Sequence, residues 1–363
     1  MSGVQMVTVT EAEGEQRLDR WLKRRFEQLN QIAVEKMCRK GEVRIDGARA
    51  KPADRVRPGN VVRVPPLPSA EQLAARPSRQ EGILSNDDIE MIQACVLFKD
   101  QHIIVLNKPA GLPSQGGSGL DHRHVDGLTP ALTFGYKERP KLVHRLDKDT
   151  SGILVLARTD RVARGLSEAF RDRTTRKIYW AAVAGVPNPK MGTVRYGLVK
   201  APGHGKHGEG EKMICIHPNK VDSTPDAKRA TTDYEVMEVL GTRVSWAALV
   251  PITGRTHQLR AHMAELGHPI VGDGKYGGSS QENLGDGWGA QLGGEISRKL
   301  HLHARSLSFQ HPVTKEKVTF TAPLPPHMEK TWKTLGWDVG SVPPDPFHIE
   351  TWDKLPPAPP RRR

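Results

Sequence analysis

The feature that most restricts the fold is a polar stretch that runs directly into an apolar one. Residues 144–152 read His-Arg-Leu-Asp-Lys-Asp-Thr-Ser-Gly, and residues 153–157 read Ile-Leu-Val-Leu-Ala. The apolar run has the length and composition of a buried strand. Charged groups beside a buried strand are costly unless they are paired. The fold must bring partners to this stretch from elsewhere in the chain, which makes it a candidate functional site.

Short apolar segments of strand type follow one another from Val96 onwards, separated by Gly and Pro turns. They cover residues 103–106, 142–146, 153–156, 178–183, 231–239, 244–250, 305–309 and 317–321. Helical patterns are fewer, one starting near residue 160 and one at 256–266. Because strands outnumber helices and do not alternate with them, we predict an α+β domain over residues 96–330, built on a mainly antiparallel mixed sheet. Residues 201–229 and 273–297 are predicted loops.

A small basic module precedes this domain. Residues 15–64 hold fourteen Lys or Arg and seven Asp or Glu, and so carry +7 of the formal charge of +13. Apolar residues at helical spacing predict two short helices, and Asp46-Gly47 predicts a hairpin in a small sheet behind them. The charge favours a polyanionic partner such as nucleic acid, although a solvated surface is the plainer alternative. The candidate contacts are the cations off the apolar faces: Arg17, Arg20, Arg24, Lys36, Arg39 and Lys40.

The remaining segments read as connections. Residues 65–95 are predicted to be a Pro-punctuated linker, and the Pro-rich residues 338–363, which end in three arginines, a disordered tail. No apolar run approaches the roughly 18 residues of a membrane span. Three scattered cysteines fit a reducing compartment. We therefore expect a cytoplasmic protein without membrane contact, and we expect a monomer.

Three motifs occur in a specific order along the predicted domain. They read HRLDxxTSG at 144–152, KxYxAxVxG at 177–185 and GRTHQLR at 254–260. In this order they resemble the RluA-type pseudouridine synthases. The likeness extends through NKPAG at 107–111, GHPIVGD at 267–273, LHA at 302–304 and APLP at 322–325. The basic module is similar to an S4 RNA-binding domain, an arrangement that most resembles the RluC and RluD kind, which act on large-subunit ribosomal RNA.

The resemblance implies a fold, a reaction and a set of site residues. The fold would be that of the pseudouridine synthases, and the reaction would isomerise specific uridines in structured RNA, with ribosomal RNA favoured and tRNA as the alternative. Asp147 would be the catalytic aspartate, Tyr179 the aromatic residue packed against the target base, and Arg260 the cation paired with the aspartate. Arg145 would enter the RNA stack when the uridine leaves it. His144 and Arg255 would be further RNA contacts.

The chemistry of this reaction fits the residue types. Isomerising uridine breaks a C–N bond and makes a C–C bond between the same ribose and base, without a redox change, so we expect neither cofactor nor metal. An ionised carboxylate can attack covalently or take a proton from the ribose, and both routes stay open. Burial would raise the pKa of the Asp147 carboxyl, and Arg260 would oppose that shift. Flipping the target base costs a few kcal/mol, of which a stacking ring can return ~1–3 kcal/mol.

The residues also allow other interpretations. Asp147 and Asp149 could serve a glycosidic hydrolase, although adjacent positions rarely supply an opposed acid and base. The chain could be an RNA-binding ribosome assembly factor without catalysis. His204, His207, Cys215 and His217 have the residue types of a metal site, but their spacing matches no regular one. The Gly-rich residues 285–289 lack the flanking strand and helix of a dinucleotide loop.

Overall fold

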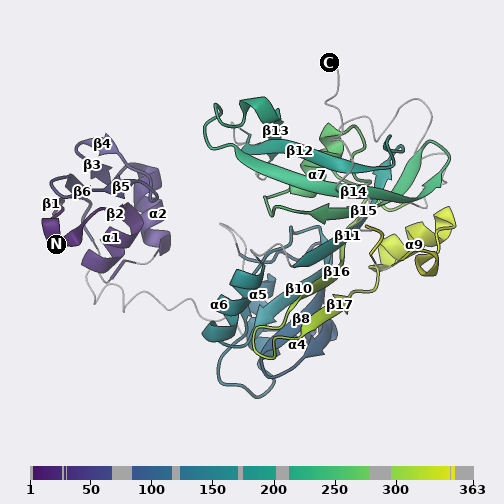
Figure 1. The fold of residues 1–363 in the computed structure, drawn as a ribbon. Coiled ribbons are helices and arrows are strands. Elements are labelled where there is room, and N and C mark those ends of the chain that lie inside the picture. The colour runs from purple at the N-terminus through teal and green to yellow at the C-terminus, as the bar shows by residue number, and fades with distance from the viewer. Residues whose placement is uncertain are drawn as a thin grey trace. The chain divides into compact units, whose positions relative to one another are not determined.

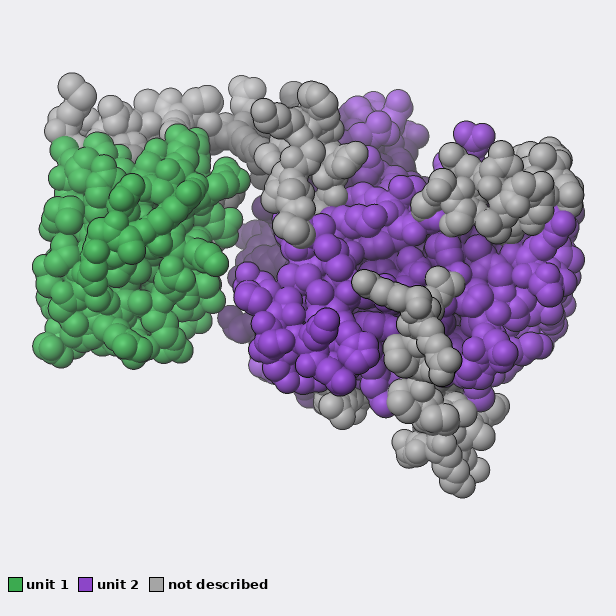
Figure 2. Space-filling model, turned by 90° about the horizontal axis from the view of Figure 1, so that it is seen from above, with its two compact units in different colours: residues 1–83 green, residues 84–363 purple. Residues whose placement is uncertain are grey.

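The computed structural model divides the chain into two compact units, residues 1–83 and 84–363, which are described separately (Figure 2). Side-chain or backbone placement is described for residues 3–26, 28–29, 31–67, 84–116, 123–170, 175–201, 212–277, 296–343 and 345–347. Within these residues, no helix combines the length and the apolar character needed to cross a membrane.

In the described residues of the N-terminal unit, two α-helices pack with short strands (Figure 1). Its elements are β1 Gln5–Thr8, η1 Glu11–Glu13, β2 Gln16–Arg17, α1 Leu18–Arg25, α2 Gln31–Lys40, β3 Arg44–Ile45, β4 Ala48–Arg49, β5 Arg55–Val56 and β6 Val61–Val64. The strands form a sheet in the order β1-β6-β3-β4 and a separate pair, β2-β5. Asp46 and Gly47, both with positive φ, turn the chain between β3 and β4 as the hairpin signal predicted.

The two helices bury one face each and expose their cations on the other. Leu18, Trp21 and Leu22 of α1 and Val34 of α2 are at most 1% exposed and pack together in one core. The six predicted contact cations are all exposed: Arg17, Arg20, Arg24, Lys36, Arg39 and Lys40.

The C-terminal unit is built on an eleven-stranded sheet. Its strands are β7 Val96–Lys99, β8 Ile103–Lys108, β9 Lys141–Leu142, β10 Ser151–Ala157, β11 Arg176–Ala184, β12 Met191–Lys200, β13 Met213–Ile216, β14 Lys228–Leu240, β15 Val244–Pro251, β16 Leu302–Gln310 and β17 Lys317–Thr321. The order is β13-β12-β14-β15-β11-β16-β10-β8-β7, with β17 on β16 and β9 on β10. Every pair is antiparallel except β10 with β16. The predicted mainly antiparallel mixed sheet is confirmed.

Helices cover both faces of this sheet. They are α4 Asn86–Ala94, α5 Val125–Leu128, α6 Asp160–Ala169, α7 Gln258–Glu265 and α9 Pro326–Leu335, with the short η2 Thr129–Leu132, η3 Pro218–Lys220 and η5 Val339–Ser341. Around β8 and β10, α4 and α5 pack on one face and α6 on the other. Around β11 and β15, α9 packs on the face of Trp180 and Trp246, and α7 on the face of Ala181 and Leu249 (Figure 1). The centre of the sheet is thereby closed to water on both sides.

The structure corrects three of the predicted connections. The linker predicted to run to residue 95 contains α4, because Ser85 caps a helix whose Ile92 is fully buried. The tail predicted to be disordered from residue 338 is ordered through its first part, because Val342 and Phe347 pack on the core beside α9. The loop predicted at 201–229 contains β13, which pairs with β12.

Candidate active site

The polar stretch forms a loop between β9 and β10, and its first residue explains why β9 is so short. A strand was predicted over 142–146, but β9 ends at Leu142. The Val155 N–H group, which would donate to the backbone of a longer β9, donates to His144 Nε2 at 2.9 Å. The His144 ring also packs edge-on against Phe170, and burial lowers its pKa to about 3. His144 therefore has a structural part in the loop, which differs from the predicted RNA contact.

Two buried polar side chains, Ser114 and Lys108, fix the loop by hydrogen bonds to its backbone. Ser114 Oγ donates to the Leu146 carbonyl at 2.7 Å and accepts from its N–H at 3.0 Å. Lys108 Nζ, on β8, is fully buried and donates to three carbonyl oxygens, those of Pro109, Leu112 and Lys148. Burial lowers the pKa of Lys108 to about 7. Three acceptors match the three protons of an ammonium group, so the geometry favours the charged form.

Asp147 lies at the tip of this loop and faces α7. Its Oδ2 is 3.6 Å from Nη1 of Arg260, a residue whose side chain is 5% exposed. Arg260 is itself fixed by Asp273, which accepts from Nε and from Nη2 at 2.7 Å each. The Asp273 side chain is fully buried, and its Oδ1 also accepts from the Lys275 and Tyr276 N–H groups. The predicted pairing of Asp147 with Arg260 is present, within a larger group that includes Asp273.

A histidine and a tyrosine complete the surroundings of Asp147. His257 Nε2 lies 3.8 Å from Asp147 Oδ2, and His257 Nδ1 lies 3.0 Å from the Tyr276 hydroxyl oxygen. Burial lowers the pKa of His257 and raises that of Tyr276 to about 12. Both groups are therefore neutral near pH 7. His257, Tyr276 and Asp273 had no predicted role, although His257 stands in the GRTHQLR motif and Asp273 ends GHPIVGD.

Tyr179 comes from the middle of the sheet. It lies on β11, opposite Leu249 of β15 and Ala304 of β16, next to an irregularity in the pairing with β16. Its half-buried ring packs against both neighbouring cores. Burial, followed by the nearby charge of Asp147, raises the pKa of Tyr179, so that its hydroxyl stays protonated. The sheet and the loop thus bring Tyr179 and Asp147 into one electrostatic environment.

The remaining predicted residues lie on the surface. Arg145 is exposed on the loop beside Asp147. Arg255, also exposed, donates from Nε to the Arg229 carbonyl at 3.2 Å, and its backbone N–H donates to Gln258 Oε1 at 3.1 Å. Both cations are accessible to a polyanion.

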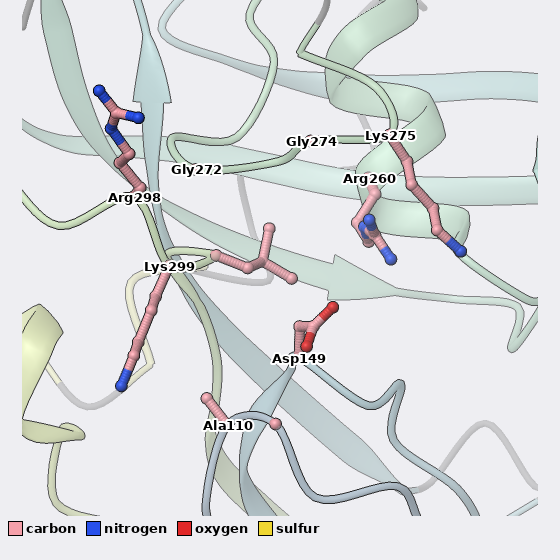
Figure 3. Close-up of a pocket in the computed structure, with 10 residues that line it drawn as sticks. Ala110, Asp149, Arg260, Gly272, Gly274, Lys275, Arg298 and Lys299 are labelled. Carbon is pink, nitrogen blue, oxygen red and sulfur yellow. The ribbon is translucent and has the colours of Figure 1, made fainter. Parts of the chain in front are cut away.

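A cavity of about 350 Å³ is lined in part by Arg260, the residue that faces Asp147 (Figure 3). Its lining comprises Ala110, Gly111, Asp149, Arg260, Gly272, Gly274, Lys275, Arg298, Lys299 and Leu300. In Figure 3, Asp149, Arg260 and Lys275 reach toward the same space, whereas Arg298 and Lys299 point in opposite directions. Asp149, which was considered above only as a possible partner of Asp147 in a hydrolase, forms part of this cavity wall. Arg260 and Lys275 together outweigh the one carboxylate, Asp149, in this space, so the cavity is suited to an anionic ligand.

The alternative metal site gains no support within the described residues. His204 and His207 lie outside them, as do residues 285–289. Cys215 Sγ donates to the Ala261 carbonyl at 3.6 Å, and His217 is exposed. No group of three or more potential metal ligands occurs in the described part of the chain.

Comparisons with known proteins match both units. Residues 102–265 match the family model described as RNA pseudouridylate synthase, and residues 16–62 match the S4 domain model. The ribosomal large subunit pseudouridine synthase C of Vibrio cholerae is 33% identical over 333 residues, which span 90% of this chain and 95% of that protein. The protein of the same name from Yersinia pestis is 35% identical over 327 residues, 88% of this chain and 92% of that protein.

A solved human structure, RNA Pseudouridylate Synthase Domain Containing 4, is 31% identical with a TM-score of 0.55, and the match covers 68% of this chain and 95% of that one. The region that matches the synthase family model contains Asp147, Tyr179 and Arg260, and it ends before Asp273 and Tyr276.

Proposed function

Because this chain belongs to the RNA pseudouridine synthase family, we propose that it isomerises specific uridines to pseudouridine in large-subunit ribosomal RNA. The observation that carries the proposal is the Asp147 carboxylate, which faces a buried arginine, Arg260, and Arg260 also lines a cavity with several cations. The relatives that match nine-tenths of the chain bear the name of that activity. A non-catalytic assembly factor is not favoured by these names.

The reaction assigns Asp147 the chemical step. The bond between C1′ of the ribose and N1 of uracil breaks, the base turns, and C1′ bonds to C5. A proton then leaves C5, and N1 gains one. The carboxylate either attacks C1′ or removes a ribose proton to start the sequence, and either route requires it ionised. Arg260 faces Asp147 Oδ2 at 3.6 Å and so places a positive charge beside the carboxylate.

The other residues act on the RNA. A uridine inside folded RNA must leave the stack, at a cost of a few kcal/mol, before a carboxylate can reach its ribose. The ring of Tyr179 stacks on the displaced base, and Arg145, exposed on the same loop as Asp147, fills the gap left behind. Arg255 and the cavity cations Lys275, Arg298 and Lys299 neutralise phosphates around the target.

The N-terminal unit adds affinity for RNA. Its exposed cations form a basic surface: Arg20, Arg24, Lys36, Arg39 and Lys40 lie on two adjacent helices, and Arg17 directly precedes the first of them. Such a surface binds phosphates without reading the sequence and so holds the substrate near the synthase unit. With ribosomal RNA as substrate, the enzyme acts in the cytoplasm, and we propose that it acts as a monomer.

The test compares the wild-type chain with Asp147→Asn on a large-subunit ribosomal RNA transcript, using carbodiimide mapping of pseudouridine. The wild type should produce pseudouridine at defined sites, and Asp147→Asn should produce none while its affinity for the RNA stays within about two-fold. Normal turnover by Asp147→Asn would remove Asp147 from the reaction. Free uracil in the products would indicate a hydrolase, and binding without any modification by the wild type would indicate an assembly factor.

A further inference from the structure

Two nitrogen donors approach the same oxygen of Asp147. Arg260 Nη1 is 3.6 Å and His257 Nε2 is 3.8 Å from Oδ2. The His257 side chain is 10% exposed, so water does not freely replace the ring at this position. In the described part of the chain, both ion-pair contacts of Asp147 thus involve Oδ2, and neither involves Oδ1.

The backbone holds His257 in an unusual conformation. Its φ of 50° lies in the left-handed region, which is costly for a residue with a Cβ, at about 1–2 kcal/mol. The residue immediately precedes α7, and its carbonyl accepts the Ala261 N–H at 2.9 Å. Strained conformations of this kind persist where the surroundings fix them, and they concentrate at functional sites.

The hydrogen bonds around Tyr276 determine which nitrogen of His257 carries the proton. The Met213 N–H donates to the Tyr276 hydroxyl oxygen at 2.8 Å. Tyr276 stays protonated, so its own hydrogen is free to point at His257 Nδ1, 3.0 Å away. In the neutral ring Nδ1 is then the acceptor and Nε2 the donor. The opposite tautomer would direct a lone pair of Nε2 at the Asp147 carboxylate, which is repulsive.

We propose that His257 is a positioning residue for the isomerisation: locked by Tyr276 as the Nε2–H tautomer, it presents a hydrogen-bond donor to Oδ2 of Asp147 and so leaves Oδ1 as the reacting oxygen. The proposal rests on the proposed function, because it concerns the same carboxylate. The distance between His257 Nε2 and Asp147 Oδ2 is 3.8 Å without RNA, and it shortens to a hydrogen bond when RNA displaces water. Catalytic hydrogen bonds are commonly long before the substrate binds.

Other charges around His257 are consistent with a neutral donor. The charged groups facing the ring are Asp147 and Asp273 on the negative side and Arg260 and Lys275 on the positive side. Lys212 lies over Tyr276, the hydrogen-bond partner of His257, with Nζ 5.6 Å from the centre of the tyrosine ring. Because the two signs offset each other, burial decides the state of the ring and keeps it neutral.

A first experiment reads the tautomer directly in the full-length protein. Long-range proton–nitrogen correlation spectra with isotope-labelled histidine distinguish Nδ1–H from Nε2–H, and His257→Gln identifies the signal. The wild type should show the Nε2–H form, and Tyr276→Phe should convert it to a mixture. An Nδ1–H form in the wild type, or no change in Tyr276→Phe, would overturn the proposal whether or not the chain is a synthase.

A second experiment measures single-turnover rates and RNA affinity for a double-mutant cycle. His257→Leu removes the donor and should slow the chemical step by about 100-fold, the cost of a misplaced reacting group. His257→Gln restores an N–H at the same reach and should recover most of that loss. Introduced into the wild type, Tyr276→Phe should slow the reaction by about 10-fold. Introduced into the His257→Gln variant, it should cause no further slowing, because Gln has no tautomer to fix.

The controls separate positioning from folding. Tyr196→Phe removes a hydroxyl from β12, where the ring faces His262 instead of His257, and should leave the rate unchanged. All variants should bind RNA within about two-fold of the wild type. Equal losses from Tyr276→Phe in both backgrounds would show that Tyr276 acts only on the fold and would refute the proposal, while an active wild type would leave the proposed function intact.

Discussion

Arg260 is bound more closely to Asp273 than to Asp147. Its Nε and Nη2 lie 2.7 Å from the two oxygens of Asp273, whereas its Nη1 lies 3.6 Å from Asp147 Oδ2. The bidentate pair fixes the plane of the guanidinium and leaves one edge for Asp147. Because Arg260 and Asp273 are buried, removing either charge leaves the other uncompensated in a medium of low polarity.

Asp273→Asn should therefore lower both stability and activity. The loss of one partner of a buried pair costs roughly 3–5 kcal/mol, which urea unfolding of the C-terminal unit would measure. Pseudouridine formation should fall as well, because Arg260 is no longer held in its orientation toward Asp147.

The double variant Arg260→Met with Asp273→Asn separates the two effects. It removes both charges and should recover part of the lost stability, since a buried pair is often replaceable by uncharged groups. It should not recover activity. Recovery of pseudouridine formation in the double variant would mean that the pair serves the fold alone.

The difference between Arg260 and Asp273 also shows what sequence could predict about the site. Arg260 could be predicted only through the resemblance of the GRTHQLR motif to the pseudouridine synthases. The charged stretch around Asp147 stood out as a candidate site because it precedes an apolar run, but its catalytic role also came from the resemblance. Asp273 follows Arg260 by thirteen residues in a Gly-rich segment, and nothing in its neighbours indicates that the chain returns to the same arginine. The contact between His257 and Tyr276 could not be predicted for the same reason, because it depends on the path of the chain from α7 to Gly277.

The fold could be predicted where the pattern of apolar side chains decides the structure. It could not be predicted where a side chain takes the place of a backbone group as a hydrogen-bond partner. The alternation and apolar runs of β8, β10, β11 and β15 are intrinsic to their segments. The strand predicted over 142–146 was wrong beyond Leu142, because the His144 ring takes the hydrogen bond of Val155 that a further strand residue would accept. No local propensity encodes that exchange.

Tyr179 should tolerate loss of its hydroxyl better than loss of its ring. If the residue stacks on the target base, Tyr179→Phe keeps the aromatic face and should stay within about five-fold of the wild-type single-turnover rate. Tyr179→Leu should lose about 10- to 100-fold, in line with ~1–3 kcal/mol for a stacked base. Equal losses in both variants would identify the phenol as a proton-transfer group instead.

Gly152 should be irreplaceable for a steric reason. It follows the candidate site on β10, has φ of 109°, and pairs with Ala304 in the parallel ladder. A Cβ at this position would overlap the Ala304 backbone. Gly152→Ala should separate β10 from β16, abolish pseudouridine formation and destabilise the unit by several times the cost of backbone strain alone, which urea titration would measure.

Gly241→Ala provides the matched control for that substitution. Gly241 also has positive φ, at 54°, but a Cβ there would meet nothing within 4 Å. This variant should lose only about 1–2 kcal/mol from the left-handed conformation and keep its activity. Similar losses at the two glycines would show that strain, and not contact with Ala304, is what matters at position 152.

Buried histidines should make the C-terminal unit sensitive to acid. Burial lowers the pKa of His144 and His303 to about 3 and that of His262 and His301 to about 4. In the unfolded chain each would titrate near 6.5. Below pH 6.5 the unfolded state therefore binds more protons than the native state, so stability is complete above that pH and is lost as the pH falls toward about 4.

The slope of stability against pH tests this account. Each histidine that stays neutral in the fold contributes about 1.4 kcal/mol per pH unit in that window. His262→Gln keeps a polar partner for Thr232, which the ring contacts at 2.9 Å, and removes one titrating group. In His262→Gln, the slope of the unfolding free energy against pH, measured with urea between pH 6.5 and about 4, should correspond to about one bound proton fewer than in the wild type. His217→Gln, which replaces an exposed histidine, controls for the loss of a histidine outside the buried set. An unchanged slope in His262→Gln would mean that this ring is already protonated in the native state, with its buried Nε2 bound to a group other than those described.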